Sequence, residues 1–122
     1  MSQITTYKDL IVWQKSIILV KLIYVLTKDF PPDEKFGLTN QLRRASVSIA
    51  SNIAEGYGRK TQKNRIQFFV IAYGSALEIE TQLHISRELK FGNIENIKGA
   101  ELVLVEIIKM LNKMTSSVRT HQ

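Results

Sequence analysis

Few side chains in this sequence could act as acids, bases or metal ligands. The 122-residue chain contains only two histidines, His84 and His121, and no cysteine. Glu80, His84 and Arg87 follow one another at spacings of four and three, which places them on one side of a helix, in line with its apolar stripe. Metal sites in helical bundles use paired Glu-x-x-His spacings, and this sequence has none. We therefore interpret Glu80, His84 and Arg87 as a structural polar cluster or a subunit contact.

The sequence offers no set of residues for catalysis. Without cysteine there is neither a Cys nucleophile nor a thiolate metal ligand, and no Ser-His-acid set lies within plausible reach. The stretch 56–60 (Gly-Tyr-Gly-Arg-Lys) follows a helix and lacks the Gly-Lys-Ser/Thr ending of a nucleotide P-loop. We expect a protein that is not an enzyme and needs no cofactor. One rival stays open, in which a symmetric ring brings copies of Glu80 and His84 together as metal ligands.

Positively charged residues are clustered at the end of this glycine-containing stretch and just after it. Four cations fall between residues 59 and 65, namely Arg59, Lys60, Lys63 and Arg65. Cations at the start of a helix oppose its dipole, which favours anions there, so their presence favours phosphate binding. Tyr57 offers a ring that could stack on a base. The sequence predicts a nucleic-acid-binding corner made of these residues, with a solvated helix-helix turn as the alternative.

Four helices must position these side chains. The only prolines are adjacent, at 31 and 32, and the apolar residues recur at helical spacing. The pattern predicts helices over about 8–28, from 33 or 36 to 57, over 61–90 and a fourth after Asn93. Gly56 and Gly58 are predicted to end the second, Thr61 to cap the third and Asn93 to cap the fourth. Short connections make successive helices antiparallel. We predict an all-α, antiparallel up-down-up-down four-helix bundle, a single domain over residues 1–122 with a frayed tail from about residue 116.

The second predicted helix is apolar on two opposite sides. One face holds the core candidates Leu38, Leu42, Ala45, Ile49 and Ile53, and nearly opposite lie Val47, Ala50 and Ala54. Arg43 lies beside this second facet, while Arg44 and Glu55 lie on the polar stripe between the two. We interpret Arg43, Arg44 and Glu55 as structural or interface residues.

The first predicted helix is apolar around most of its circumference, more than one bundle can bury. Exposing such a surface would leave an apolar patch beyond that of a typical monomer. A cyclic ring of identical subunits would bury it through head-to-tail contacts. The sequence therefore predicts a ring-forming homo-oligomer.

The net charge and the amino-terminal residues indicate which partners and which compartment to expect. The net charge of +6 and pI near 9.7 are compatible with binding to nucleic acid or another polyanion. The amino-terminal residues do not read as a secretory signal. The longest apolar run, 17–26, is interrupted by Lys21 and is too short to span a membrane. We expect a cytoplasmic protein with no membrane partner.

Several short motifs resemble those of one family. They are Asp-Leu-x-x-Trp-Gln-Lys at 9–15, Phe-Pro at 30–31, Gln-Leu-x-Arg-Ala at 41–45, Ser-Ile-x-x-Asn-Ile-Ala-Glu-Gly-x-Gly-Arg at 48–59 and Ala-x-Gly-Ser-x-x-Glu at 72–78. Together they resemble the four-helix bundle proteins encoded within intervening sequences of bacterial 23S rRNA genes. The resemblance extends over almost the whole chain, and Ala50 occupies a position that is often proline in that family.

The resemblance implies a homopentameric ring of bundles. The chain is also similar, more distantly, to the accessory variability protein of diversity-generating retroelements, a basic pentameric barrel that engages reverse transcriptase and nucleic acid. No catalytic residue is carried over from either family. Two functions remain in competition: a ring that binds RNA or DNA, and a scaffold that binds only protein.

Overall fold

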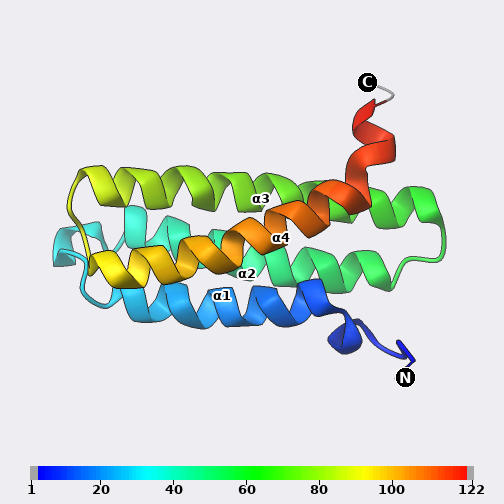
Figure 1. The fold of residues 1–122 in the computed structure, drawn as a ribbon, viewed down its shortest axis with the longest axis horizontal. Coiled ribbons are helices and arrows are strands. Elements are labelled where there is room, and N and C mark those ends of the chain that lie inside the picture. Colours follow the sequence, from blue (N-terminus) through cyan, green and yellow to red (C-terminus); the bar gives the residue numbers. More distant parts are fainter. Residues whose placement is uncertain (1–2, 121–122) are drawn as a thin grey trace.

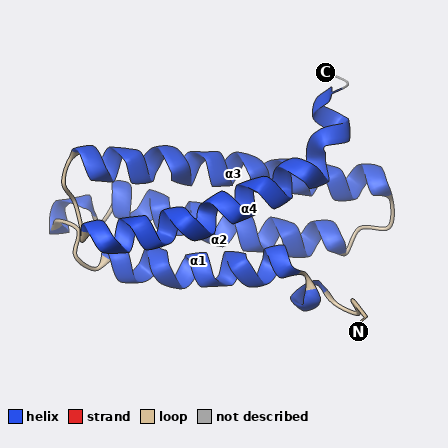
Figure 2. Cartoon of the chain, viewed as in Figure 1, coloured by secondary structure: helices blue, strands red, loops and turns tan. Residues whose placement is uncertain are grey.

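The computed structural model describes residues 3–120, with side chains as far as Ser116. Over this part the chain forms four α-helices and two short 3-10 turns, with no strand (Figure 2). The α-helices are α1 (Ile11–Thr27), α2 (Leu38–Tyr57), α3 (Gln62–Glu88) and α4 (Ile94–Thr120). The 3-10 turns are η1 (Tyr7–Asp9), before α1, and η2 (Pro32–Glu34), between α1 and α2. The predicted all-α fold is confirmed.

The four helices form an antiparallel bundle (Figure 1). Each helix contacts the two that flank it in the cycle α1, α2, α3, α4 and back to α1. Helices across the diagonal, α1 with α3 and α2 with α4, meet only through the core between them. The α1–α2 pair therefore lies opposite the α3–α4 pair. The α2–α3 turn lies at one end of the bundle, and the α1–α2 and α3–α4 connections lie at the other (Figure 1).

The core follows the helical spacing of the sequence closely in α2 and less closely in α3 and α4. The α2 face predicted as core is buried throughout: Leu38, Leu42, Ala45, Ile49 and Ile53. In α4 the core residues Ile97, Ala100, Leu104 and Leu111 follow the helical spacing, but Ile107 is also fully buried and Ile108 is half-buried. In α3 the core stripe turns towards Ala72, Ala76, Ile79 and Leu83. Leu77 is consequently exposed, and the predicted continuation of the apolar stripe into Glu80 and His84 is wrong.

The first helix begins later than predicted because a separate turn precedes it. The Thr6 side chain accepts a hydrogen bond from the Lys8 N–H at 2.8 Å, and the Asp9 carboxylate accepts one from the Thr6 N–H at 3.1 Å. Leu10 is then extended, so α1 begins at Ile11. Hydrogen bonds from the Thr5 N–H, the Thr6 N–H and the Thr5 hydroxyl lower the pKa of Asp9.

The predicted caps of the last two helices are present. The Thr61 side chain accepts a hydrogen bond from the Asn64 N–H at 3.2 Å at the start of α3. Asn93 Oδ1 accepts hydrogen bonds from the N–H groups of Glu95 and Asn96 at 2.8 and 3.2 Å at the start of α4. Both satisfy amides that the first helical turn leaves unpaired.

Gly56 serves packing and does not end α2. It is buried inside the helix, where a Cβ atom would lie 2.7 Å from Cε1 of Phe69. Its missing side chain therefore allows α2 and α3 to approach closely near their shared turn. The helix ends one residue before Gly58.

The carboxyl-terminal part of α4 turns away from the bundle (Figure 1). The Thr115 hydroxyl donates to the Leu111 carbonyl at 2.8 Å, a back-bond that often accompanies helix bending. The backbone is helical to Thr120, beyond the point near residue 116 where the sequence predicts fraying. His121 lies outside the described residues. None of the described helices is long and apolar enough to cross a membrane.

Candidate nucleic-acid interface

The predicted basic corner lies at the turn between α2 and α3. Tyr57 is the last residue of α2, and Lys63 and Arg65 lie in the first turns of α3. The four cations and Tyr57 are thus brought together at one end of the bundle. Within this cluster, however, the arginines and the lysines have different surroundings.

The two arginines are held by internal contacts. The Arg59 guanidinium lies 4.5 Å from the centre of the Phe68 ring and its Nη2 is 3.9 Å from Glu55 Oε2. Arg65 Nε donates to the Arg59 carbonyl at 2.7 Å, which ties the turn to α3. Arg59 still exposes 48% of its side chain. These contacts fix the arginine positions and leave part of their N–H groups open to a ligand.

The two lysines are exposed and have no hydrogen-bond or ion-pair partner among the described residues. Lys63 follows the first residue of α3, and Lys60 precedes the capping Thr61. Both ammonium groups therefore add positive charge to a helix end whose dipole is already positive. They are the cations of this corner that are most available to a phosphate.

Tyr57 is less available for base stacking than the sequence suggests. Its side chain is half-buried, and the Arg65 guanidinium lies 5.7 Å from the centre of its ring. The ring and the cation already interact within the chain. A base could reach Tyr57 only beside or in place of Arg65.

Glu80, His84 and Arg87 do not form a cluster. Glu80 and His84 are exposed, and no hydrogen bond joins the three side chains. Arg87 forms an ion pair with Glu101, which links α3 to α4. No three His, Asp or Glu side chains among the described residues are grouped closely enough to hold a metal ion.

Arg43 contacts two residues of α1. Its Nε donates to the Thr27 hydroxyl at 2.9 Å, and its guanidinium lies 4.5 Å from the centre of the Tyr24 ring. Arg43 thereby joins α2 to the end of α1. Glu55 contacts Arg59 and not Arg44, although the two share a stripe of α2.

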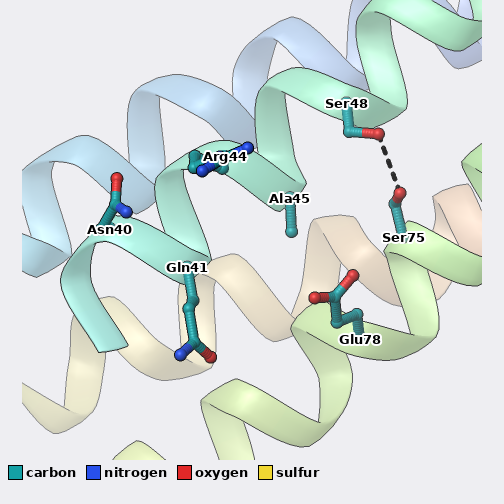
Figure 3. A pocket seen from close by; sticks show the side chains of 7 residues that line it. All are labelled: Asn40, Gln41, Arg44, Ala45, Ser48, Ser75 and Glu78. Carbon is teal, nitrogen blue, oxygen red and sulfur yellow. Dashed lines mark hydrogen bonds between the residues drawn. The ribbon is translucent and has the colours of Figure 1, made fainter. Parts of the chain in front are cut away.

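One polar groove was not predicted as a site. It lies between α2 and α3 and has a volume of about 330 Å³ (Figure 3). Its lining residues are Asn40, Gln41, Arg44, Ala45, Ser48, Ser75 and Glu78. Arg44 was predicted to lie on the polar stripe of α2, but the register between α2 and α3 that brings it to one groove with Glu78 exists only in the fold.

A family model matches the chain, and a solved structure shares its fold. A family model described as 23S rRNA-intervening sequence protein matches residues 8–113. The fold is similar to a crystal structure from Bacteroides thetaiotaomicron, whose description is a protein with unknown function from the S23 ribosomal protein family. The two share 23% sequence identity with a TM-score of 0.76, over 86% of this chain and 98% of that one. No curated protein matches the sequence at a significant level.

Proposed function

The chain belongs to the 23S rRNA-intervening sequence protein family, and from that premise we propose that it is a non-enzymatic, ring-forming homo-oligomer that binds RNA through its basic corner. The basic corner consists of Arg59, Lys60, Lys63 and Arg65 at the α2–α3 turn. The observation that carries the proposal is the distribution of exposed side chains: apolar ones lie on two opposite sides of the bundle, and four cations, two of them unpaired lysines, are clustered at the α2–α3 turn.

The first apolar surface is a groove between α1 and α2. It has a volume of about 310 Å³ and is lined by Tyr7, Trp13, Ile17, Val20, Val47, Ala50, Ser51 and Ala54. This is the second facet of α2 together with the side of α1 that faces it. It supports the interpretation that α1 carries more apolar surface than its own bundle buries.

The second apolar surface lies on α3 and α4. Leu102 is 71% exposed, and Val105 and Leu77 are also exposed. Because α1–α2 and α3–α4 are opposite pairs, one surface of a subunit can meet the other surface of the next. Such head-to-tail contacts close into a ring when the rotation between subunits allows it. The family resemblance implies five subunits.

A ring also makes the basic corner more effective. A single subunit presents two unpaired lysines and two partly engaged arginines there, which gives weak phosphate binding. Repeating the corner around a ring makes every later contact intramolecular and raises its effective concentration. RNA affinity is therefore expected to depend on assembly.

Assembly is tested by light scattering at micromolar concentration. We expect a mass several times 14.0 kDa for the wild type and a mass of one subunit for Leu102→Glu. Leu102 is so exposed that the substitution should leave the subunit fold intact, which circular dichroism would verify. A monomeric wild type would overturn the ring.

RNA binding is tested by titrating labelled single-stranded RNA and DNA at two salt concentrations. Wild-type affinity should fall with salt, by about 0.7 log units per log unit of salt for each neutralised phosphate of a single strand. A Lys60→Glu, Lys63→Glu variant should lose most of the affinity. The matched control, Lys28→Glu, Lys90→Glu, has the same net charge but changes the opposite end of the bundle, and it should retain more.

The alternative is a protein-binding scaffold without nucleic-acid affinity. The observation in its favour is that Arg59 and Arg65 are engaged within the chain. Absence of wild-type binding at low salt would favour this scaffold. Equal losses in the two lysine variants would move the nucleic-acid site away from the corner.

A further inference from the structure

The groove between α2 and α3 combines opposite charges that do not satisfy each other. No hydrogen bond or ion pair holds the Arg44 guanidinium among the described residues. The Glu78 carboxylate has one contact, a long one of 3.5 Å from Gln82 Nε2. Both side chains are exposed and both line the groove. An unpaired guanidinium and a nearly unpaired carboxylate in one hollow are ready to bind a ligand that complements both.

Two acceptors that line the groove share one donor beside it. Gln82 of α3 is buried, and its Nε2 lies 3.5 Å from both Gln41 Oε1 on α2 and Glu78 Oε2 on α3. Hydrogen bonds of this length are weak, so one amide satisfies neither acceptor fully. A ligand edge that carries N–H groups would supply better donors to Glu78 and Gln41.

The α2 side of the groove offers donors. Figure 3 shows Asn40, Gln41 and Arg44 along α2, with Gln41 extending from α2 towards α3 and Glu78 projecting from α3 into the space between the two helices. Ser48 and Ser75 hydroxyls are 2.9 Å apart and link the two helices at the end of the hollow. Asn52 Nδ2 donates to Ser48 Oγ at 3.1 Å, which orients this pair. The groove therefore presents a guanidinium from α2 and a carboxylate from α3, with amide and hydroxyl groups between them.

We propose that this groove binds an unpaired guanine base of single-stranded RNA. Guanine has two acceptors, O6 and N7, on one edge, and arginine binds that pair bidentately. Its Watson–Crick edge carries the N1–H and N2–H donors, which match the Glu78 carboxylate. Adenine mixes a donor and an acceptor on both edges and cannot satisfy the two charges. The hollow of about 330 Å³ lies at the lower end of the range for small-molecule pockets, roughly 300–1,000 Å³.

The lining of the groove lies largely within the motifs recognised in the sequence. Six of the seven lining residues, all except Asn40, belong to the motifs at 41–45, 48–59 and 72–78. Among these, Arg44 and Glu78 are exposed, so packing of the core does not account for them. The inference rests on the proposed RNA binding and adds base selectivity to it. The basic corner binds phosphates, and the groove binds guanine in preference to other bases.

The test compares short uridine oligomers that differ in one central base: uracil, guanine, adenine, inosine or 7-deazaguanine. We expect guanine to bind about tenfold more tightly than adenine, the order expected for one bidentate contact. Inosine lacks the N2 amino group and 7-deazaguanine lacks N7, so each should lose much of that gain. Glu78→Gln and Arg44→Lys should abolish the preference for guanine. The matched control Glu88→Gln removes another exposed carboxylate of α3 and should retain it.

The outcomes separate this inference from the proposed function. Binding of the uridine oligomer without any gain from guanine would overturn the guanine site and leave RNA binding in place. If no oligomer binds, but guanosine monophosphate binds wild type and not Glu78→Gln, the groove stands and the RNA function fails. If neither binds, both fail.

Two further results would assign the groove to another occupant. Displacement of the guanine oligomer by free glycine, a zwitterion, would point to an amino-acid site and overturn the guanine assignment. A fall in oligomer mass on Glu78→Gln, measured by light scattering, would show that the groove is a subunit contact and would overturn it as well.

Discussion

The two tight turns of the bundle, α2–α3 and α3–α4, lie at opposite ends and are built differently. In the α3–α4 turn, Lys90 and Gly92 have φ of +59° and +76°. The Phe91 N–H donates to the Ser86 carbonyl at 2.9 Å, and the Phe91 and Phe30 ring centres are 5.7 Å apart. The α2–α3 turn contains no positive φ, and its Gly58 has φ of −76°.

The difference shows what each turn contributes. The α3–α4 turn depends on backbone conformation and on packing against the end of α1, so its residues affect stability. The α2–α3 turn makes few demands on the backbone and carries exposed cations instead, so its residues are available for binding. Substitutions matched between the two turns should therefore change different properties.

The largest effect is expected for Gly92→Ala. A Cβ atom would lie 2.8 Å from both Leu26 Cδ1 and Phe30 Cε1, and the residue would adopt a left-handed conformation. Left-handed backbone costs about 1–2 kcal/mol and overpacking about 1–3 kcal/mol, so a loss of about 2–5 kcal/mol is expected. Urea unfolding at fixed protein concentration measures it, since the stability of an oligomer depends on concentration.

Gly58→Ala is the matched substitution in the other turn. Its Cβ would be 3.6 Å from the Glu55 carbonyl oxygen, an ordinary contact, and its φ suits alanine. The free energy of unfolding should be unchanged or higher by about 0.4–1 kcal/mol. Similar losses for the two glycine variants would show that the turns do not differ in the way described.

Removing either of the two helix caps is expected to destabilise the protein less than Gly92→Ala. Asn93 accepts hydrogen bonds from two amides of α4, whereas Thr61 accepts one, at 3.2 Å, from α3. Loss of such a cap costs about 0.5–2 kcal/mol, and we expect Asn93→Ala to lie in the upper part of that range and Thr61→Ala in the lower part. Urea unfolding of both variants checks the order, and a larger loss for Thr61→Ala would contradict it.

The sequence predicted those parts of the fold that depend on local signals. The four helices, the caps at Thr61 and Asn93 and the core face of α2 follow from spacing and cap chemistry, and all are present. The role of Gly56 was wrong because a glycine near a helix end looks the same whether it stops the helix or admits the Phe69 ring. The predicted apolar stripe of α3 was wrong only from Leu77 onward, because the small alanines Ala72 and Ala76 face the core while the larger Leu77 is exposed.

The candidate sites were predictable only in part. A run of four cations is visible in the sequence. The contacts of Arg59 with the Phe68 ring and of Arg65 with the Tyr57 ring depend on side-chain geometry and are not. The α2–α3 groove could not be predicted, because Arg44 and Glu78 are far apart in the chain and meet through the register of two helices. The motif at 72–78 was the available signal, since it contains both Ser75 and Glu78.

The smallest effect, and the one that separates charge from packing, is expected for exposed lysines at the two ends of α3. Lys63 lies in the first turn of α3, where a cation opposes the helix dipole, and Lys90 lies just beyond the last turn, where a cation is favourable. Glutamine has nearly the same helix propensity as lysine, so Lys63→Gln changes mainly the charge of α3. Lys90 lies outside the helix, so Lys90→Gln also changes mainly the charge. At low ionic strength Lys63→Gln should raise the free energy of unfolding by about 0.3–1 kcal/mol and Lys90→Gln should lower it by a similar amount. Both shifts in the free energy of unfolding should shrink at high salt because exposed charges are screened.

RNA affinity should fall only for Lys63→Gln. A Lys63→Gln variant that is more stable and binds RNA less well would show that the charge at the α2–α3 turn serves binding and not stability. Destabilisation by Lys63→Gln at low salt would instead show that this lysine is paired with a carboxylate in the assembled protein.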